Sequence, residues 1–483
     1  MLILTRFEGE IATKSRAVRS QFVRKLVENI RDALRKSGIV GKTYHENSRI
    51  FVETDDADAI EVLRTVFGIS SISPIEAVCQ PRLDEIVATG RGAFVDAVTG
   101  REFAVRAKRI GLHNFKSKDI EIKLGAELVR HAKVNLSHPD VTASVDVFPE
   151  KAYLYHRRLY GHGGIPLGVE GKAVVLISGG YDSAAAAWLM HKRGLKLDYI
   201  LCNLAGAAYE HSVLGVAKHI YDKWGHGAKP LLHVVDFSDV VADLKESITM
   251  RFAQVVLKRL FYRVAEKIAG ETNAHAIITG ESLGQVSSQT LLNLHTIDKV
   301  ANMPVFRPLL GMDKKEIIAL TRTIGTYVLS MPIQEYCALV PTKPATGASL
   351  KAIEQEEAKM DLSLLDNAIF QRKKFRLSEY AEDDLYLPHL YAEKVPDDSC
   401  VIDCRSKPEY ENWHYPGAVH IPGDDLLTDF TKREKKKVYI LYCQFGIQTA
   451  VLAEKMQEKG YDAYSFKGGV RGVRLFQAQR SVE

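Results

Sequence analysis

A glycine- and serine-rich segment, SGGYDS at residues 178–183, is the first group of residues whose types and spacing suggest chemistry. It follows an apolar stretch that ends in Leu176 and Ile177 and precedes the apolar helical run AAAAWLM. Gly179 and Gly180 let the backbone approach a ligand closely, and a helix that begins here directs unpaired N–H groups toward that ligand. The segment therefore predicts an anion site for a phosphate or pyrophosphate. It lacks the Gly-Lys-Ser/Thr ending of a Walker loop and the GxGxxG spacing of a dinucleotide loop.

The polar side chains of this loop have separate expected roles. Ser178 and Ser183 offer hydroxyl donors, and Ser183 can also cap the helix. Asp182 beside bound phosphates would be repelled, so we expect it to act through Mg²⁺.

Cys443 closes the apolar stretch VYILYC and is followed by QFGIQ. Two interpretations are open: a buried core thiol, or a thiol held at a strand end for chemistry. The six cysteines are spread over the chain, which argues against a disulfide framework. CVIDC (Cys400 and Cys404) has the spacing of half a zinc site, but no second Cys/His pair obviously completes it.

A basic block covers residues 101–125, with seven Lys/Arg against three acidic residues. The expected strand FAVRAKR places Arg106 and Lys108 on one face, and Arg109, His113 and Lys116 follow. Such a cluster suits a phosphate backbone, with His113 and Phe115 available for base stacking. The alternative is a charged sheet edge that prevents aggregation.

The elements that must position these residues follow from the apolar pattern. Over 172–340, near-continuous apolar strands alternate with helices, which predicts a doubly wound parallel sheet with its ligand crevice at the carboxyl ends of the strands. Residues 396–483 alternate again as a second, small α/β domain. A small α+β unit is expected over 1–59 and mixed strands and helices over 60–160. The charged segment 341–395 is interpreted as a partly helical linker.

Composition sets broad limits. At 483 residues, and about 150 residues per domain, the chain predicts roughly three domains. Its 46% hydrophobic and 26% charged residues are typical of a globular protein. No apolar run approaches the about 18 residues of a membrane span, and the N-terminus is unlike a signal peptide, so a cytoplasmic protein without a membrane partner is expected. The net charge of +5 is too small to argue for nucleic acid by itself.

SGGYDS resembles the pyrophosphate loop (PP-loop) of the N-type ATP pyrophosphatases. Together with ITGESLGQVSSQTL (278–291), FRPLLGMDKKEII (306–318) and EYCALVP around Cys337, it closely resembles the ThiI family, the tRNA uridine 4-sulfurtransferases. The resemblance implies a multidomain α/β fold: an N-terminal α+β ferredoxin-like domain (1–59), a THUMP RNA-binding domain (60–160), a PP-loop ATP pyrophosphatase domain (161–340), the linker, and a C-terminal rhodanese-like domain (396–483).

The resemblance also implies roles for individual residues. ATP and Mg²⁺ are the expected cofactors, and Asp182 and Lys314 would serve activation rather than mere binding. The alternative for Lys258 and Lys314 is that each only decorates a helix surface. The residues implied in nucleotide contacts, together with the loop itself, are Leu176, Ile177, Ser178, Gly179, Gly180, Ser183, Lys258, Gly280 and Gln289.

Rhodanese-like domains hold a cysteine sulfur in the loop after the central strand, which implies that Cys443 carries a persulfide. Its sulfur would reach ring carbon 4 of an adenylated uridine, position 8 of tRNA in the family, and Cys337 would then form a disulfide with Cys443. A buried thiol is the alternative for Cys337, and Cys79, Cys202, Cys400 and Cys404 are assigned to structure. CQFGIQT contains no arginine, which favours a cysteine desulfurase over thiosulfate as donor.

The expected partners are thus tRNA, a cysteine desulfurase and, for a second role, the thiamin sulfur carrier protein; a homodimer is left open. Three other functions are compatible with parts of the sequence: an RNA-binding protein with a decayed nucleotide site, another PP-loop tRNA thiolase, and a persulfide relay for thiamin biosynthesis without tRNA modification. The intact SGGYDS motif argues against the first.

Overall fold

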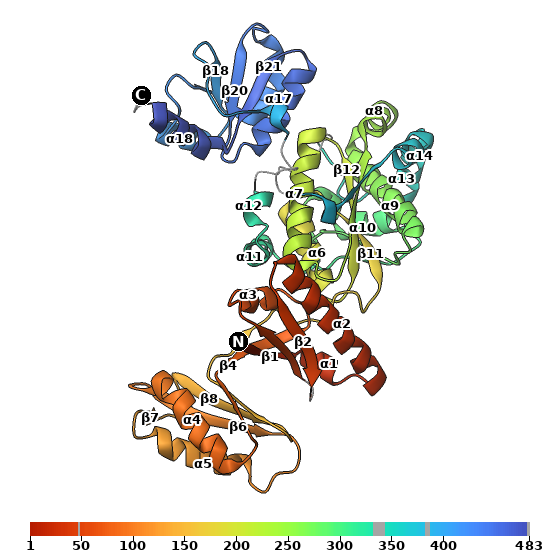
Figure 1. Ribbon diagram of the computed structural model, residues 1–483. Helices are drawn as coiled ribbons and strands as arrows, with labels where there is room; N and C mark the ends of the chain where they lie inside the picture. The colour runs from red at the N-terminus through yellow and green to blue at the C-terminus, as the bar shows by residue number, and fades with distance from the viewer. Residues whose placement is uncertain (47–48, 332–342, 382–386, 481–483) are drawn as a thin grey trace. The chain divides into compact units, whose positions relative to one another are not determined.

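A computed structural model describes residues 1–46, 49–331, 343–381 and 387–480, which form four β-sheets, each covered by helices (Figure 1). The chain divides into two compact units, Met1–Glu170 with His191–Gly194, and Gly171–Met190 with Leu195–Glu483. Within the described ranges, no helix combines the length and the hydropathy that crossing a bilayer requires.

The first sheet of the N-terminal unit has the order β10-β4-β1-β3-β2 and is antiparallel. Helix α2 (Arg16–Lys36) buries one apolar stripe against this sheet, while α1 (Gly9–Ala12) and α3 (Ala59–Arg64) complete the cover. The strands are β1 (Leu2–Phe7), β2 (Gly41–Glu46), β3 (Arg49–Thr54), β4 (Ile69–Ile75) and β10 (Leu159–Tyr160).

The predicted boundary at residue 59 is wrong, because α3 and β4 belong to this first sheet. Strand β4 pairs with β1 over its whole length, so a cut at 59 would remove a central strand. The second sheet has the order β5-β9-β8-β6-β7 and packs against α4 (Leu83–Val98) and α5 (Ser117–Leu128). Its strands are β5 (Ala77–Cys79), β6 (Glu102–Arg109), β7 (Lys133–Val134), β8 (Val141–Val147) and β9 (Ala152–Tyr155).

The large sheet of the second unit has the order β15-β14-β11-β12-β13-β16. All neighbours are parallel except β13 and β16. The chain runs outward from β11 through β12 to β13 and then returns to place β14 on the other side of β11. This reversal creates a topological switch point between β11 and β14, where open α/β sheets bind ligands. The strands are β11 (Lys172–Leu176), β12 (Lys196–Asn203), β13 (Leu231–Asp236), β14 (Ile277–Ile278), β15 (Val305–Phe306) and β16 (Lys373–Arg376).

Helices cover both faces of this sheet, which confirms the doubly wound fold (Figure 1). One apolar core joins the sheet to α8 (Ser238–Ser247), α9 (Ala253–Glu271), α10 (Leu291–Asp298), α13 (Leu350–Glu357) and α14 (Leu362–Phe370). On the other face, α6 (Tyr181–Lys192) meets α7 (Ala207–Trp224) through the edge-to-face pair of Trp188 and Trp224. Helices α11 (Lys314–Ile324) and α12 (Tyr327–Ser330) lie beside them.

The interpretation of 341–395 as a linker is wrong over most of its described part. Ile353, Leu365 and Ile369 lie in the core of the large sheet, and β16 pairs antiparallel with β13. The segment is amphipathic: charged residues face solvent while widely spaced apolar residues supply the core. Its high charge therefore hid a structural role.

The C-terminal domain has a parallel sheet of order β17-β21-β20-β18-β19. Its strands are β17 (Tyr391–Ala392), β18 (Cys400–Asp403), β19 (Val419–His420), β20 (Val438–Tyr442) and β21 (Asp462–Phe466). Its helices are α15 (Lys407–Asn412), α16 (Gly423–Asp429), α17 (Ile447–Glu458) and α18 (Gly469–Arg480). Strand β20 is buried from Tyr439 to Tyr442, and Cys443 follows it directly, in the turn that leads to α17.

Candidate functional site

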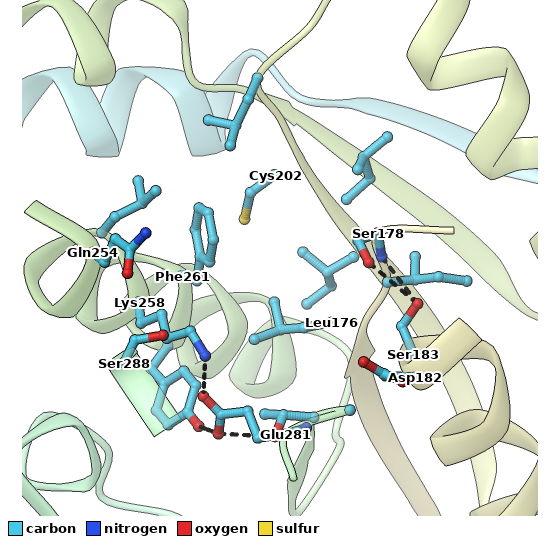
Figure 2. A pocket seen from close by; sticks show the side chains of 18 of the residues that line it. Leu176, Ser178, Asp182, Ser183, Cys202, Gln254, Lys258, Phe261, Glu281 and Ser288 are labelled. Carbon is cyan, nitrogen blue, oxygen red and sulfur yellow. Dashed lines mark hydrogen bonds and ion pairs between the residues drawn. The ribbon is translucent and has the colours of Figure 1, made fainter. Parts of the chain in front are cut away.

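A cavity of about 310 Å³ lies at the carboxyl ends of β11, β12 and β14, at the switch point of the large sheet (Figure 2). Apolar side chains line this cavity together with hydroxyl, carboxylate and ammonium groups. The apolar lining consists of Leu176, Ile177, Ile200, Leu201, Leu204, Leu257 and Phe261; the polar lining consists of Ser178, Asp182, Ser183, Lys258, Glu281, Ser288 and Gln289. An apolar lining with a few convergent polar groups is typical of a ligand site.

The SGGYDS loop turns tightly between β11 and α6, and its hydroxyls hold the turn together. Gly179 has a φ of +76°, a conformation that glycine adopts without strain. The Ser183 hydroxyl donates to the Gly180 carbonyl at 3.1 Å and accepts from the Ser178 N–H at 3.3 Å. The Tyr209 hydroxyl donates to the Ser178 carbonyl at 2.9 Å. These bonds fix the loop backbone beside the cavity.

Gly280 allows the loop after β14 to approach the SGGYDS loop closely. A Cβ atom at this position would lie 2.6 Å from the carbonyl carbon of Asp182 and 2.7 Å from the nitrogen of Ser183. These contacts are with backbone, which cannot move aside as a flexible side chain can. Gly280 is therefore needed to bring the two loops together at the mouth of the cavity.

Asp182 is buried, and both of its carboxylate oxygens are held by side chains from distant parts of the chain. Lys314 Nζ, at the first residue of α11, lies 2.8 Å from Oδ1. Gln285 Nε2 donates to Oδ2 at 2.8 Å. The structure thus brings together two residues, Asp182 and Lys314, that are 132 positions apart in the sequence.

Glu281 is the centre of a buried polar network on the floor of the cavity (Figure 2). Its Oε1 accepts from Lys258 Nζ at 2.7 Å. Its Oε2 accepts from Tyr262 OH at 2.7 Å, from Arg307 Nε at 2.8 Å and from Thr279 Oγ1 at 3.0 Å. The network locks Lys258 in place on α9, with its ammonium group directed at the cavity wall.

The environment of Glu281 acts in two directions on its pKa. Burial alone would raise that pKa, but the charges of Lys258 and Arg307 and the hydrogen bonds to the carboxylate outweigh it. The pKa of Glu281 is lowered from 4.5 to about 2. The carboxylate therefore remains ionised at neutral pH and balances the cations around it.

A second chemical centre lies in the C-terminal domain, where the chain turns around Cys443. The Gly446 N–H donates to Cys443 Sγ at 3.2 Å, and Thr449 Oγ1 lies 3.5 Å from the same sulfur. Ser465 donates to the Gly446 carbonyl at 2.6 Å, so the Thr449 hydroxyl, 2.7 Å from Ser465 Oγ, donates to Ser465. Donors aimed at a sulfur at a helix N-terminus stabilise a thiolate.

Two glycines make this turn possible. Gly446 has a φ of +85°. A Cβ at Gly469, the first residue of α18, would lie 2.5 Å from the Cys443 carbonyl oxygen and 2.7 Å from the Gly446 nitrogen. The backbone of α18 therefore packs directly under the sulfur loop. Cys443 itself is only 3% exposed, as expected of a core thiol. It also accepts the Gly446 N–H at the end of a strand, as expected of a thiol held for chemistry.

The basic side chains of residues 101–125 differ in how exposed they are and in what they contact. Arg106 and Lys108 are exposed on the face of β6 turned away from the helices, and Lys116 is exposed at the start of α5. Arg109 donates to the His113 carbonyl, and His113 Nε2 lies 3.1 Å from the Phe148 carbonyl, so these two also stabilise their own turn. The expectation that Phe115 is available for stacking is wrong, because its ring is buried in the core.

Cys337 lies outside the described residues, so its predicted role stays a prediction. Within the described ranges, no group of three or more His, Cys, Asp or Glu side chains is arranged to hold a metal ion.

Comparisons with known proteins match the four parts of the chain to four family models. Residues 2–73 match the ThiI ferredoxin-like domain, 82–157 the THUMP domain, 168–362 the thiamine biosynthesis protein ThiI, and 387–475 the rhodanese-like domain. The tRNA sulfurtransferase of Desulfurococcus amylolyticus is 35% identical over 96% of this chain and 97% of its own length. That of Shewanella woodyi is 34% identical over 96% of this chain and 99% of its own.

This chain belongs to the tRNA sulfurtransferase family. A solved 4-thiouridine synthetase in complex with RNA and bound ATP is also similar, with 30% identity and a TM-score of 0.69 over 77% of this chain and 98% of its own. The fold expected from the resemblance, with ferredoxin-like, THUMP, PP-loop and rhodanese-like domains, is confirmed, and the protein is a sulfurtransferase.

In this sulfurtransferase, most of the residues predicted to contact a nucleotide converge on one cavity. Leu176, Ile177, Ser178, Asp182, Ser183, Lys258, Gly280 and Gln289 line it. Gly179 and Gly180 lie in the same loop, and Lys314 reaches it through Asp182. The roles of these residues stay predictions.

The sequence reasoning missed the residues that hold the predicted ones in place, namely Glu281, Tyr262, Arg307 and Gln285. Glu281 directly follows Gly280 at the end of a strand, and that position is the one signal that could have identified it. Arg307 directly follows β15 and Tyr262 lies on α9, and nothing in their local sequence marks them as partners of Glu281.

Proposed function

We propose that this sulfurtransferase converts a uridine of tRNA to 4-thiouridine, using ATP to activate the base and Cys443 to carry the sulfur. The observation that carries the proposal is the Asp182–Lys314 pair, 2.8 Å apart, beside the SGGYDS loop at the mouth of the cavity. The similar solved protein, a 4-thiouridine synthetase with bound ATP and RNA, supports the same reaction.

The cavity suits ATP in shape and chemistry. Leu176, Ile200 and Phe261 offer apolar surface for a flat base. The glycine turn with its N–H groups and serine hydroxyls suits phosphates at the start of α6. Asp182 would supply a carboxylate oxygen to Mg²⁺, and the charge of the ion would offset that of the phosphates.

In the activation step, O4 of the uridine attacks the α-phosphorus of ATP, and pyrophosphate leaves with the electron pair of the broken P–O bond. Negative charge accumulates on the leaving pyrophosphate. The ammonium group of Lys314, held at the loop by Asp182, would stabilise that charge. Lys258, held by Glu281, adds a second positive charge from the opposite side of the cavity.

In the transfer step, the terminal sulfur of a Cys443 persulfide attacks carbon 4, and AMP departs with O4. Cys337 then attacks Cys443 Sγ, the S–S bond to the nucleotide breaks, and 4-thiouridine leaves with a Cys337–Cys443 disulfide behind it. A dithiol reductant restores both thiols. The N–H of Gly446 would stabilise the Cys443 thiolate before sulfur is loaded and again after the disulfide is reduced.

Recognition of tRNA rests on the N-terminal unit in this proposal. Arg106, Lys108 and Lys116 are exposed and directed away from the core of their domain, which suits phosphate contacts. Arg109 and His113 are partly buried and shape the neighbouring turn. A cysteine desulfurase would load the persulfide on Cys443, in the cytoplasm.

A second role is compatible with the same centre. The model that matches residues 168–362 is that of a thiamine biosynthesis protein, and a Cys443 persulfide could also serve the thiamin sulfur carrier protein. That transfer would need Cys443 but neither the basic surface nor tRNA. A variant with Arg106, Lys108 and Lys116 replaced by glutamine would separate the two roles, losing only the tRNA reaction.

The proposal is tested by incubating the full chain with ATP, unmodified tRNA, cysteine and a cysteine desulfurase. Formation of 4-thiouridine is followed by the near-ultraviolet absorbance that a thiocarbonyl base has and uridine lacks. Asp182→Ala should abolish pyrophosphate release and thiolation together. Cys443→Ser should abolish thiolation while tRNA-dependent pyrophosphate release continues. Loss of pyrophosphate release in Cys443→Ser would contradict the division of labour between the two centres.

A further inference from the structure

Cys404, assigned to structure from the sequence, lies directly opposite Cys443 in the C-terminal sheet. Strands β18 and β20 are parallel neighbours whose register pairs Cys400 with Tyr439 and Asp403 with Tyr442. The ladder continues beyond these pairs, because the Cys404 N–H donates to the Tyr442 carbonyl at 2.9 Å. The next pair in the register is therefore Cys404 and Cys443.

The two thiols also share one face of the sheet. Side chains alternate along a strand, so residues that are paired directly point to the same side. Cys404 and Cys443 belong to the same buried cluster, with exposures of 5% and 3%. Neighbouring strands lie about 4.8 Å apart, which falls inside the Cα separation of about 4.4–6.8 Å that a disulfide requires.

We propose that Cys404 is a second resolving thiol, which attacks the sulfur-loaded Cys443 within the same domain and forms a Cys404–Cys443 disulfide. The proposal rests on the sulfur-carrier role of Cys443 and adds a residue to that reaction. Both thiols belong to the described residues and lie on neighbouring strands.

The step balances without an external oxidant. The Cys404 thiolate attacks Cys443 Sγ, a new S–S bond forms, and the bond from Cys443 Sγ to the outer sulfur breaks. The outer sulfur takes the electron pair and leaves as hydrosulfide, or as the thiolate of the acceptor when it is already bound to one. The two cysteine sulfurs are oxidised to a disulfide, and the outer sulfur is reduced from the sulfane to the sulfide state. The proton of Cys404 leaves with the sulfide.

Burial makes Cys404 a selective partner. Cys404 and Cys443 are both buried in the same core, so Cys404 can reach Cys443 Sγ without any movement of the domain relative to the rest of the chain. Burial, the nearby Cys443 and Asp403 together raise the pKa of the Cys404 thiol well above its usual range. Cys404 therefore stays protonated while Cys443 carries sulfur, and it attacks slowly, after transfer has had time to occur.

The test uses the full chain with Cys337→Ser, so that the other proposed resolving thiol is absent. Cys443 is loaded with sulfur by a cysteine desulfurase and cysteine, and the excess is removed. Sulfide release is then followed over time without tRNA, and the tryptic peptides 395–405 and 438–455 are examined for a disulfide link by mass spectrometry. We expect sulfide release in step with a link between Cys404 and Cys443, reversed by dithiothreitol.

Replacing Cys404 by serine, and separately by alanine in case the buried hydroxyl disturbs the fold, should remove the link and prolong the persulfide by about tenfold or more. Cys400→Ser is the matched control. Cys400 lies on the same strand but pairs with Tyr439, about 13 Å further along the sheet, so its loss should change nothing. Loading of Cys443 without a Cys404 link, or equal persulfide lifetimes in the Cys404 variants, would overturn this inference alone. Failure of Cys443 to accept sulfur at all would overturn the proposed function as well.

Discussion

Replacing Glu281 by glutamine tests the electrostatic design of the cavity floor. The change keeps the size of the side chain and part of its hydrogen bonding but removes the charge that balances Lys258 and Arg307. The lowering of the Glu281 pKa from 4.5 to about 2 corresponds to about 3 kcal/mol of folding free energy at neutral pH. That value agrees with the cost of about 3–5 kcal/mol for breaking a buried ion pair by removing one partner.

The pH dependence of this effect has a definite sign. The pKa of Glu281 is lower in the folded protein than in the unfolded chain, so its stabilisation is complete above about pH 4.5 and is lost as the pH falls toward about 2. The difference in unfolding free energy between the wild type and Glu281→Gln should thus be about 3 kcal/mol at neutral pH and less than half of that at about pH 3.

The assay must report on one domain of a multidomain chain. The chain has three tryptophans, and Trp188 and Trp224 form a pair inside the nucleotide domain. In a Trp413→Phe background, urea unfolding followed by tryptophan fluorescence therefore reports on that domain alone. A difference that stays constant from neutral pH to about pH 3, or that lies below about 1 kcal/mol at neutral pH, would refute the ionised network around Glu281.

Three further predictions follow from single contacts. Gly280→Ala should weaken ATP binding by about tenfold or more, because the added Cβ would press on the Asp182 backbone. Gly270→Ala is the control: its Cβ would meet nothing within 4 Å, so the affinity for ATP should not change in titrations. Lys314→Gln should slow pyrophosphate release by about a hundredfold with little change in ATP affinity, and an equal loss in both would contradict a role in activation. Ile369→Ala should lower the unfolding free energy of the nucleotide domain, measured in urea, by about 2–4 kcal/mol, because Ile369 is buried. Phe370→Ala, at the exposed neighbour, should change it by less than about 0.5 kcal/mol. Small and equal effects of the two substitutions would support the interpretation of this segment as a linker.

Local sequence was sufficient to predict both candidate centres. SGGYDS and the Cys443 turn are short segments whose conformations depend mainly on glycines and on a helix that starts nearby, so a role for each can be predicted without the rest of the fold. The doubly wound sheet was equally predictable, since buried parallel strands leave long apolar runs. The domain limits near residue 59 and over 341–395 were wrong, because membership of a sheet or a core depends on pairing with strands far away in the sequence.

The sequence by itself determined which residues are predicted to do chemistry: the SGGYDS loop, Asp182, Lys314 and Cys443. Only the tertiary structure decided which residues hold and complement them. Glu281 gathers Lys258 and Arg307 from separate elements, and Cys404 stands beside Cys443 through the register of two strands 39 positions apart. Such contacts depend on long-range packing and on the register of hydrogen bonds between strands. Neither of these can be predicted from the pattern of apolar residues in a local segment.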